Sequence, residues 1–313
     1  MKCIGESIVV TGGAGFIGSC LVKTLAEQVG KCRITIIDNL CNGHLQYLPD
    51  SPCISLQKVD LRSNEDVLKV VKDTRPDIVF HLAALHFIPY CNTHQSETLQ
   101  VNIVGTQNLL EALYQYPPSS LVIASSMAVY PVNEKANSED DPYEPTDIYG
   151  LSKIANEMQL KMFSSKVTTQ CAAVRLSNVY GPNETSPHVV PEILSQIKQG
   201  SDTIALGNVK PKRDYIYVQD VAEALIALAQ RNRHSYRVYN VGYGQEYSVN
   251  KVLAYLSDIT GRRLTASVAA ERVRKTDRMH LLADVQRIRT EIGWSPQVSL
   301  LQGLYELWES VKI

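Results

Sequence analysis

A glycine-rich turn between an apolar run and a helical pattern constrains the fold of this chain most strongly. The run Ser7–Thr11 leads into Gly12-Gly13-Ala14-Gly15-Phe16-Ile17-Gly18. In a strand–turn–helix unit, the first glycine permits a tight turn, the second lets the backbone approach a pyrophosphate, and the third allows close helix–strand packing. Amide groups at the helix N-terminus then bind the phosphates. The turn predicts a dinucleotide-binding fold, provided that the surrounding pattern agrees.

The first half of the chain repeats the strand–helix order that such a turn requires. Apolar runs rich in Ile and Val predict buried parallel strands at Ser7–Thr11, Ile34–Asp38, Ile54–Val59, Ile78–Leu82, Leu121–Ser125 and Ala172–Leu176. Helical patterns lie between them at Ile17–Gln28, Glu65–Asp73, Ser96–Tyr114 and Ile148–Ser164. This repetition predicts an α/β fold with a Rossmann-type, doubly wound parallel sheet.

The pattern changes after Leu176, where prolines and glycines separate short elements before an apolar helix at Val218–Ala229. We expect residues 1–176 to form a nucleotide-binding Rossmann domain, to which residues 214–242 return. Residues 177–213 and 243–313 are expected to form a smaller, discontinuous α/β lobe that packs over the carboxyl edge of the sheet and binds the substrate.

Composition argues against several classes of partner. The chain has 31 Lys and Arg against 32 Asp and Glu, so it lacks the basic excess that would hold a nucleic-acid backbone. No apolar run approaches the length of a membrane span, and the first residues are typical of a strand rather than a signal peptide. The seven scattered cysteines contain no C-x-x-C pair, which favours reduced thiols over disulfides or zinc. We expect a soluble, cytoplasmic protein without a metal.

Two acidic residues end predicted strands. The carboxylate of Asp38 can accept hydrogen bonds from the adenosine ribose, and no Arg or Lys lies in the glycine loop or shortly after Asp38. This pattern favours NAD over NADP; a simple turn cap is the alternative for Asp38. Asp60, which Leu61 follows, is placed to meet the adenine edge, although a turn aspartate explains it equally well.

Tyr149 and Lys153 lie four residues apart at the start of a predicted helix. They share a helical face, so the ammonium of Lys153 can approach the phenol of Tyr149. A nearby cation lowers the pKa of a tyrosine, which predicts a usable base near neutral pH. Ser126 ends the preceding strand at the carboxyl edge, where its hydroxyl could hold a reacting oxygen. In isolation, a chance pair and a strand-ending serine explain these residues as well.

Further motifs follow in a fixed order along the chain. They are H-L-A-A at His81–Ala84, V-N-x-x-G-T at Val101–Thr106, R-L-S-N-V-Y-G-P at Arg175–Pro182, R-D-Y-I-Y-V-Q-D-V-A at Arg213–Ala222, Y-N-V-G at Tyr239–Gly242, L-A-D at Leu282–Asp284 and G-W-S-P at Gly293–Pro296. Together with the glycine turn and Tyr149…Lys153, they span nearly the whole chain. The sequence resembles the extended short-chain dehydrogenase/reductases, and within them the nucleotide-sugar epimerases and dehydratases, nearest in pattern to the UDP-hexose 4-epimerases.

The resemblance implies a role for particular residues. The catalytic residues would be Ser126, Tyr149 and Lys153. Contacts to the NAD cofactor would come from Gly12, Gly15, Phe16, Ile17, Gly18, Asp38, Asn39, Asp60, Leu61, Ala83, Ala84, Asn102, Tyr149 and Lys153. A nucleotide-sugar, preferably a UDP-sugar, would be held by His86, Ser126, Tyr149, Asn178, Arg213, Arg274 and Asp277. Guanidinium groups suit phosphate oxygens, although surface ion pairing is the commoner use of an arginine. The resemblance also implies a homodimer that packs through the Ser96–Tyr114 and Ile148–Ser164 helices.

The residues after Ser126 help to choose the reaction. Relatives that eliminate water across C5–C6 carry Asp-Glu where this chain has Met127-Ala128, and the glucuronate decarboxylases carry Glu at the second position. Neither side chain here transfers protons, so 4,6-dehydration is disfavoured. Glucuronate 4-epimerases carry Arg at the position of Pro89. The resemblance therefore implies 4-epimerisation of a UDP-hexose through a transient 4-keto sugar. Leu281, smaller than the usual gate tyrosine, leaves room for an N-acetylhexosamine.

Alternative functions stay open at this point. They are a nucleotide-sugar 4-ketoreductase, an epimerase acting at another carbon, and a non-catalytic NAD-binding scaffold, against which the intact set of Ser126, Tyr149 and Lys153 argues. Two departures from the 4-epimerase pattern keep them open. Pro131 replaces a glycine, and His86 replaces a lysine of the pocket wall. His86 can be a substrate contact, a second acid/base or a packed histidine.

Overall fold

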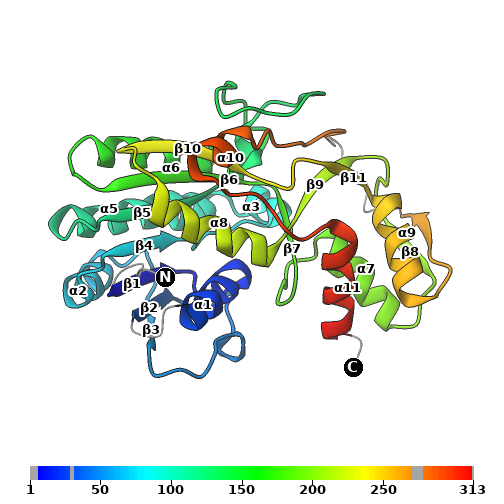
Figure 1. The fold of residues 1–313 in the computed structure, drawn as a ribbon, viewed down its shortest axis with the longest axis horizontal. Coiled ribbons are helices and arrows are strands. Elements are labelled where there is room, and N and C mark those ends of the chain that lie inside the picture. The colour runs from blue at the N-terminus through cyan, green and yellow to red at the C-terminus, as the bar shows by residue number, and fades with distance from the viewer. Residues whose placement is uncertain (1–5, 29–31, 270–277, 312–313) are drawn as a thin grey trace.

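The computed structural model describes residues 6–28, 32–269 and 278–311. Within these residues, a seven-stranded sheet forms the centre of the molecule (Figure 1). Its spatial order is β10 (Tyr236–Val241), β6 (Gln170–Leu176), β5 (Ser120–Ser126), β4 (Ile78–His81), β1 (Ser7–Thr11), β2 (Arg33–Asp38) and β3 (Ile54–Lys58). All neighbouring strands are parallel. Because the order reverses between β1 and β4, a ligand crevice opens at their carboxyl ends. The predicted doubly wound α/β fold is confirmed.

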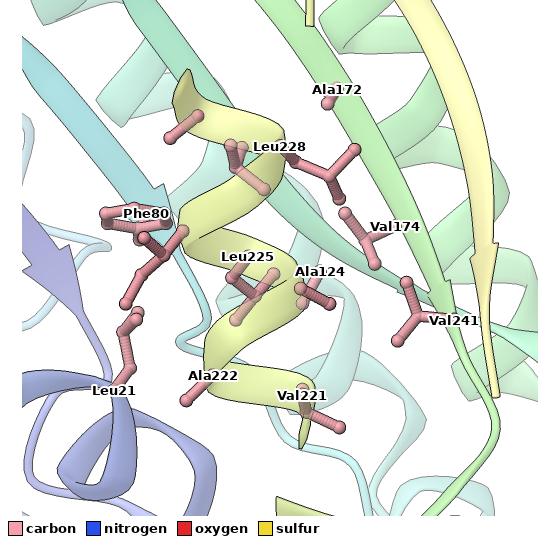
Figure 2. Packing of buried hydrophobic residues seen from close by; sticks show 14 of the residues in the cluster. Leu21, Phe80, Ala124, Ala172, Val174, Val221, Ala222, Leu225, Leu228 and Val241 are labelled. Atoms are coloured by element: carbon pink, nitrogen blue, oxygen red, sulfur yellow. The ribbon is translucent and has the colours of Figure 1, made fainter. Parts of the chain in front are cut away.

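Helices cover both faces of this sheet. One face carries α1 (Phe16–Gln28), α8 (Val218–Arg231) and α10 (Gln286–Ile292), and the other carries α2 (Asn64–Thr74), α5 (Gly105–Gln115) and α6 (Ile148–Ser164). Figure 2 shows α8 on the first face, with Leu225 and Leu228 among apolar side chains of the strands and of α1. Burial on both faces explains why continuous apolar runs, without alternation, predicted the strands correctly.

A second group of elements packs around its own core beside the large sheet (Figure 1). Its strands are β7 (Asn178–Tyr180), β9 (Lys212–Tyr217) and β11 (Glu246–Ser248) in one sheet, and β8 (Thr203–Leu206) and β12 (Thr265–Val268) in another. Its helices are α7 (Val189–Lys198), α9 (Val249–Thr260) and α11 (Leu300–Val311). The range 243–313 also contributes α10 to the large sheet, and β9 crosses residue 214. The domain boundaries proposed from the sequence stay a prediction.

Some elements differ from the sequence predictions. The run Ile54–Val59 was expected to be buried, but β3 is an edge strand without a fully buried side chain, because it has a neighbour on one side only. The helix expected over Ser96–Tyr114 consists of α4 (Gln95–Leu99), a π-helical turn (Gln100–Val104) and α5. A further short helix, α3 (Ile88–Thr93), precedes α4. None of the helices in the described ranges is long and apolar enough to cross a membrane.

Candidate active site

A cavity of about 1040 Å³ lies at the carboxyl ends of the parallel strands, between the large sheet and the second group of elements. With the exception of Asn102, every candidate residue that the structure describes lines it: Gly12, Gly15, Phe16, Ile17, Gly18, Asp38, Asn39, Asp60, Leu61, Ala83, Ala84, His86, Ser126, Tyr149, Lys153, Asn178 and Arg213. Arg274 and Asp277 lie outside the described residues. The structure thus brings together residues that are up to 201 positions apart in the sequence, from Gly12 to Arg213.

The glycine turn has the shape that a pyrophosphate requires. Gly12 has φ 69°, in the left-handed region that favours glycine, and a Cβ there would lie 2.8 Å from the backbone of Ala83. A Cβ on Gly18 would lie 2.0 Å from the carbonyl oxygen of Gly12. At Gly15 the nearest atom would be 3.3 Å away, so this position faces the more open side. Helix α1 begins directly after, at Phe16, and Phe16, Ile17 and Gly18 of its first turn line the cavity, where helix N-termini favour phosphates.

Asp38 serves two purposes at the end of β2. Its Oδ2 accepts a hydrogen bond from Ala14 N at 3.0 Å, and its Oδ1 accepts one from Leu40 N at 2.8 Å. The carboxylate therefore anchors the glycine turn while it lines the cavity. Each carboxylate oxygen has a second acceptor site, so a ribose hydroxyl can still bind. The turn cap and the ribose contact are compatible rather than exclusive interpretations.

Asp60 is engaged mainly by the protein itself. Arg62 donates to both of its oxygens, at 2.9 and 2.7 Å, and Asn39 Nδ2 donates at 3.0 Å. The Arg62 hydrogen bonds hold the pKa of Asp60 well below its usual range. Arg62 also lines the cavity, although the sequence analysis did not select it. The signal in the sequence that could have identified Arg62 is its position two residues after Asp60.

Asn102, which was expected to contact the cofactor, is not among the residues that line the cavity. Its side chain is buried in the π-helical turn, where Oδ1 accepts from Leu85 N at 2.8 Å. Its Nδ2 donates to Leu85 O at 2.9 Å and to Ser152 Oγ at 3.0 Å. Both hydrogens of Nδ2 are donated to protein partners, so the amide holds the wall segment at Leu85 against α6.

The start of α6 presents Tyr149 and Lys153 to the end of β5. Asp147 caps the helix, because its Oδ1 accepts from Gly150 N at 2.7 Å. Lys153 is buried; its Nζ lies 5.7 Å from the ring centre of Tyr149 and donates to Ala124 O at 2.9 Å. Ser126 Oγ accepts from Ala128 N at 3.1 Å and also bonds Tyr149. The three predicted catalytic side chains therefore meet at one point of the cavity.

Burial dominates the ionisation of this group. It raises the pKa of the Tyr149 phenol, and the hydrogen bond with Ser126 opposes that rise. Burial also lowers the pKa of Lys153 to about 8. The expected lowering of the Tyr149 pKa by Lys153 is not seen in the protein alone: burial dominates, and Ser126, not Lys153, is the group that opposes the rise. Met127 and Ala128, which line the cavity beside Ser126, bring no titratable side chain to it.

A second titratable cluster faces the cavity around His86. Its Nε2 lies 3.2 Å from Ser186 Oγ, and its ring centre is 5.8 Å from that of His188. His188 Nδ1 and Glu184 Oε1 are 2.5 Å apart, and the Glu184 side chain is only 3% exposed. Burial, His188 and Lys153 together lower the pKa of His86 to about 4, so this imidazole is neutral at pH 7. The sequence analysis missed Glu184 and His188 because His86, beside which they lie, is about 100 positions earlier in the chain.

Two guanidinium groups, those of Arg213 and Arg278, also line the cavity. Arg213 on β9 donates to the carbonyl oxygens of Lys212 at 2.8 Å and Arg278 at 2.7 Å. Arg278 donates to Thr146 Oγ1 at 3.1 Å and lines the cavity, although it was not a predicted site residue. Asn178 begins β7 next to β9. These groups suit the phosphates of a nucleotide. Among the described residues, no cluster of three or more His, Cys, Asp or Glu side chains could hold a metal.

Comparison with known proteins gives a consistent family. The model of the NAD-dependent epimerase/dehydratase family matches residues 8–242. A putative UDP-glucose 4-epimerase of Methanocaldococcus jannaschii is 31% identical, over 95% of this chain and 95% of its own length. The structure of a UDP-N-acetylglucosamine 4-epimerase from Methanobrevibacter ruminantium, in complex with UDP-N-acetylmuramic acid, has a TM-score of 0.90 and 31% identity and covers 100% of both chains. The UDP-glucose 4-epimerase of Thermus thermophilus, in complex with NAD, has a TM-score of 0.86 and 31% identity over 96% of this chain and 97% of its own.

Proposed function

Because the chain belongs to the NAD-dependent epimerase/dehydratase family, we propose that it epimerises C4 of a UDP-hexose or UDP-N-acetylhexosamine through a transient 4-keto sugar. The observation that carries this proposal is the meeting of Ser126, Tyr149 and Lys153 in the cavity that the glycine turn and Asp38 also line. The relatives named above act on UDP-sugars, which supports the choice of substrate class.

The chain's own residues provide the proton transfer. Tyr149, acting as the phenolate, takes the proton of the 4-hydroxyl and becomes the phenol, and Ser126 shares that proton through their hydrogen bond. Lys153, charged below its pKa of about 8, stabilises the phenolate before the proton arrives. NAD bound along the glycine turn supplies the acceptor, and later the donor, of a hydride. After the keto sugar turns in the cavity, Tyr149 returns the proton and the configuration at C4 is inverted.

The neighbours of this group favour epimerisation over elimination. Loss of water from C6 needs an acid and a base beyond Tyr149, and Met127 and Ala128 provide neither at their positions. Arg213, Asn178 and Arg278 would bind the diphosphate and leave the sugar at Tyr149.

The proposal is tested with purified protein, a panel of UDP-, GDP-, dTDP- and CDP-sugars, and no added reductant. NMR should show inversion at C4 of a UDP-hexose or UDP-N-acetylhexosamine. Tyr149→Phe should lower kcat by roughly 100-fold or more while most of the bound NAD is retained through the other cofactor contacts. A 4-keto-6-deoxy product would overturn the assignment. Turnover that needs added NADH would instead identify a ketoreductase.

One observation favours a second candidate, epimerisation at the carbon next to C4. His86 is neutral, faces the cavity, and lies close enough to Lys153 to be affected by its charge, with the Glu184–His188 pair beside it in the cavity wall. A hydrogen next to a ketone is acidic, so a neutral imidazole could remove it from the 4-keto sugar. In D2O, this reaction would place deuterium at C3 or C5 of the product, and His86→Gln would abolish the label. A product free of solvent deuterium excludes it.

We also propose a homodimer that packs through α4, the π-helical turn, α5 and α6. Leu151, Met158 and Met162 project from one face of α6 and are 47%, 42% and 63% exposed. Val104 of the neighbouring π-helical turn is 48% exposed. A contiguous apolar face of this kind favours burial against a second copy.

A further inference from the structure

Behind the catalytic residues, α6 is tied to β5 at consecutive positions. Tyr149, Lys153 and Glu157 recur every four residues, so they lie along one face of α6. Lys153 Nζ donates to Ala124 O at 2.9 Å, and Ser125 Oγ donates to Glu157 Oε1 at 2.5 Å. The next residue of β5 is Ser126. The carboxylate of Glu157 therefore holds the strand end from which the Ser126 hydroxyl reaches Tyr149.

Glu157 is itself clamped in the interior. Its side chain is 1% exposed, and that of its partner Arg175 on β6 is 2% exposed. Arg175 Nε donates to Oε1 at 2.9 Å and Nη2 donates to Oε2 at 2.8 Å, while Tyr143 OH donates to Oε2 at 2.8 Å. The guanidinium lies 4.6 Å from the ring centre of Tyr130 and 5.0 Å from that of Tyr143. A buried ion pair is weak evidence for a role in stability, so its position beside the catalytic group calls for another explanation.

The charge of Glu157 acts on Lys153. Burial lowers the pKa of Lys153, whereas Cys91 of α3 and, to a smaller extent, Glu157 raise it. The other groups near this ammonium are Tyr149, His81 at the end of β4, and His86. The pKa of His81 is lowered to about 3, that of His86 to about 4, and burial raises that of Cys91. Of the two groups that raise the pKa of Lys153, Glu157 is the carboxylate, and the Cys91 thiol is shifted further toward its neutral form.

We propose that Glu157, clamped by Arg175, is a positioning residue for the catalytic group: it keeps the ammonium of Lys153 charged and fixes the strand end that carries Ser126. The inference rests on the proposed function for its catalytic consequence. Without the carboxylate, Lys153 loses its proton at lower pH, and the phenolate of Tyr149 loses its stabilising cation there. Activity should then fall at a lower pH than in the wild type.

Glu157→Gln tests this, because glutamine keeps the size of the side chain and removes its charge. The matched control is Glu139→Gln. Glu139 is also buried, its carbonyl oxygen accepts from Arg175 Nη1, and it is absent from the groups that affect Lys153. In Glu157→Gln, the alkaline limb of kcat should move down by roughly one pH unit, with KM little changed. In Glu139→Gln the limb should stay in place, even if stability falls.

A direct readout separates this inference from the proposed function. The measurement follows the Nζ resonance of Lys153 in ¹⁵N-lysine-labelled protein, which is assigned by its loss in Lys153→Met. This resonance should titrate at lower pH in Glu157→Gln than in the wild type, and at the wild-type pH in Glu139→Gln. If Lys153 titrates as in wild type in Glu157→Gln, or shifts equally in both variants, the inference is overturned. If the Nζ titration shifts only in Glu157→Gln, and the wild-type protein turns over no sugar of the panel, the inference is supported and the proposed function is refuted.

The double variant Glu157→Gln/Arg175→Met keeps the test decisive if the single variant does not fold. Removing both charges of a buried pair is far better tolerated than removing one. In the double variant, the alkaline limb of kcat and the Nζ titration of Lys153 should still move to lower pH. Wild-type values in a folded double variant would show that the pair serves the fold alone.

Discussion

At the scale of single residues, the groups that face the cavity are held from behind by the backbone. Asp38 is fixed by Ala14 N and Leu40 N, Asp147 by Gly150 N, and Ser126 by Ala128 N. Such bonds restrict the rotamers before any ligand arrives, which is how a site is kept in its productive geometry.

Two glycines of the turn should respond differently to the same substitution. Gly18→Ala places a Cβ 2.0 Å from a carbonyl oxygen, so the turn must shift, at a cost of about 1–3 kcal/mol in stability, and NAD binding should also be lost. Gly15→Ala meets its nearest atom at 3.3 Å and should keep stability close to wild type while it weakens NAD binding. Denaturant unfolding measures the stability of the two variants, and the NAD content of the purified proteins measures their cofactor binding. Equal stability of the two variants would refute this account of the turn.

Single residues were predictable where their partners lie close in the sequence. Tyr149 and Lys153 share one helix, and Asp38 ends the strand after the glycine turn, so their spacing, together with the family resemblance, identified them. The contact of His86 with Ser186 spans 100 positions, and Arg175 on β6 meets Glu157 on α6. Spacing carries no information about such contacts, because tertiary packing creates them. Asn102 was matched to a role at the cofactor, whereas packing directs its amide to Leu85 and Ser152.

At the scale of elements, prediction succeeded where burial was two-sided. The central strands β1, β4, β5 and β6 are apolar on both faces and were recognised from their composition. β10 was not assigned as a strand, because its first residues, Tyr236 and Arg237, are only partly buried. The strands β7 and β11 have three residues each, too few for any periodicity to show.

The N-terminal cap of α6 links an element to the chemistry. Asp147→Ala removes the acceptor of Gly150 N and should cost about 1 kcal/mol of stability. Since Tyr149 lies in the same turn, kcat should also fall. Ser248→Ala is the control, because Ser248 caps α9 through Lys251 N at 3.3 Å, away from the catalytic residues. It should lower stability by a similar amount and leave kcat unchanged. A drop in kcat in both variants would indicate a general effect of stability.

At the scale of the whole molecule, the proposed dimer accounts for the apolar face of α6. Met158→Lys together with Met162→Glu places charges on that face, where they are tolerated in a monomer but not in a buried interface. Light scattering coupled to size-exclusion chromatography should show a dimer for the wild type and a monomer for the variant. Leu301→Lys on α11, where Leu301 is 44% exposed, should remain dimeric. A wild-type monomer, or a dimeric double variant, would contradict the proposed interface.

The central claim is that C4 of the sugar is oxidised and then reduced within one cavity, with Tyr149 as the acid/base. The most direct measurement uses a UDP-hexose that carries deuterium at C4, incubated in ordinary water without added reductant. The account predicts that the 4-epimer keeps its deuterium at C4, because the same hydride returns to the opposite face of the sugar. Loss of the label from C4 during inversion would contradict it.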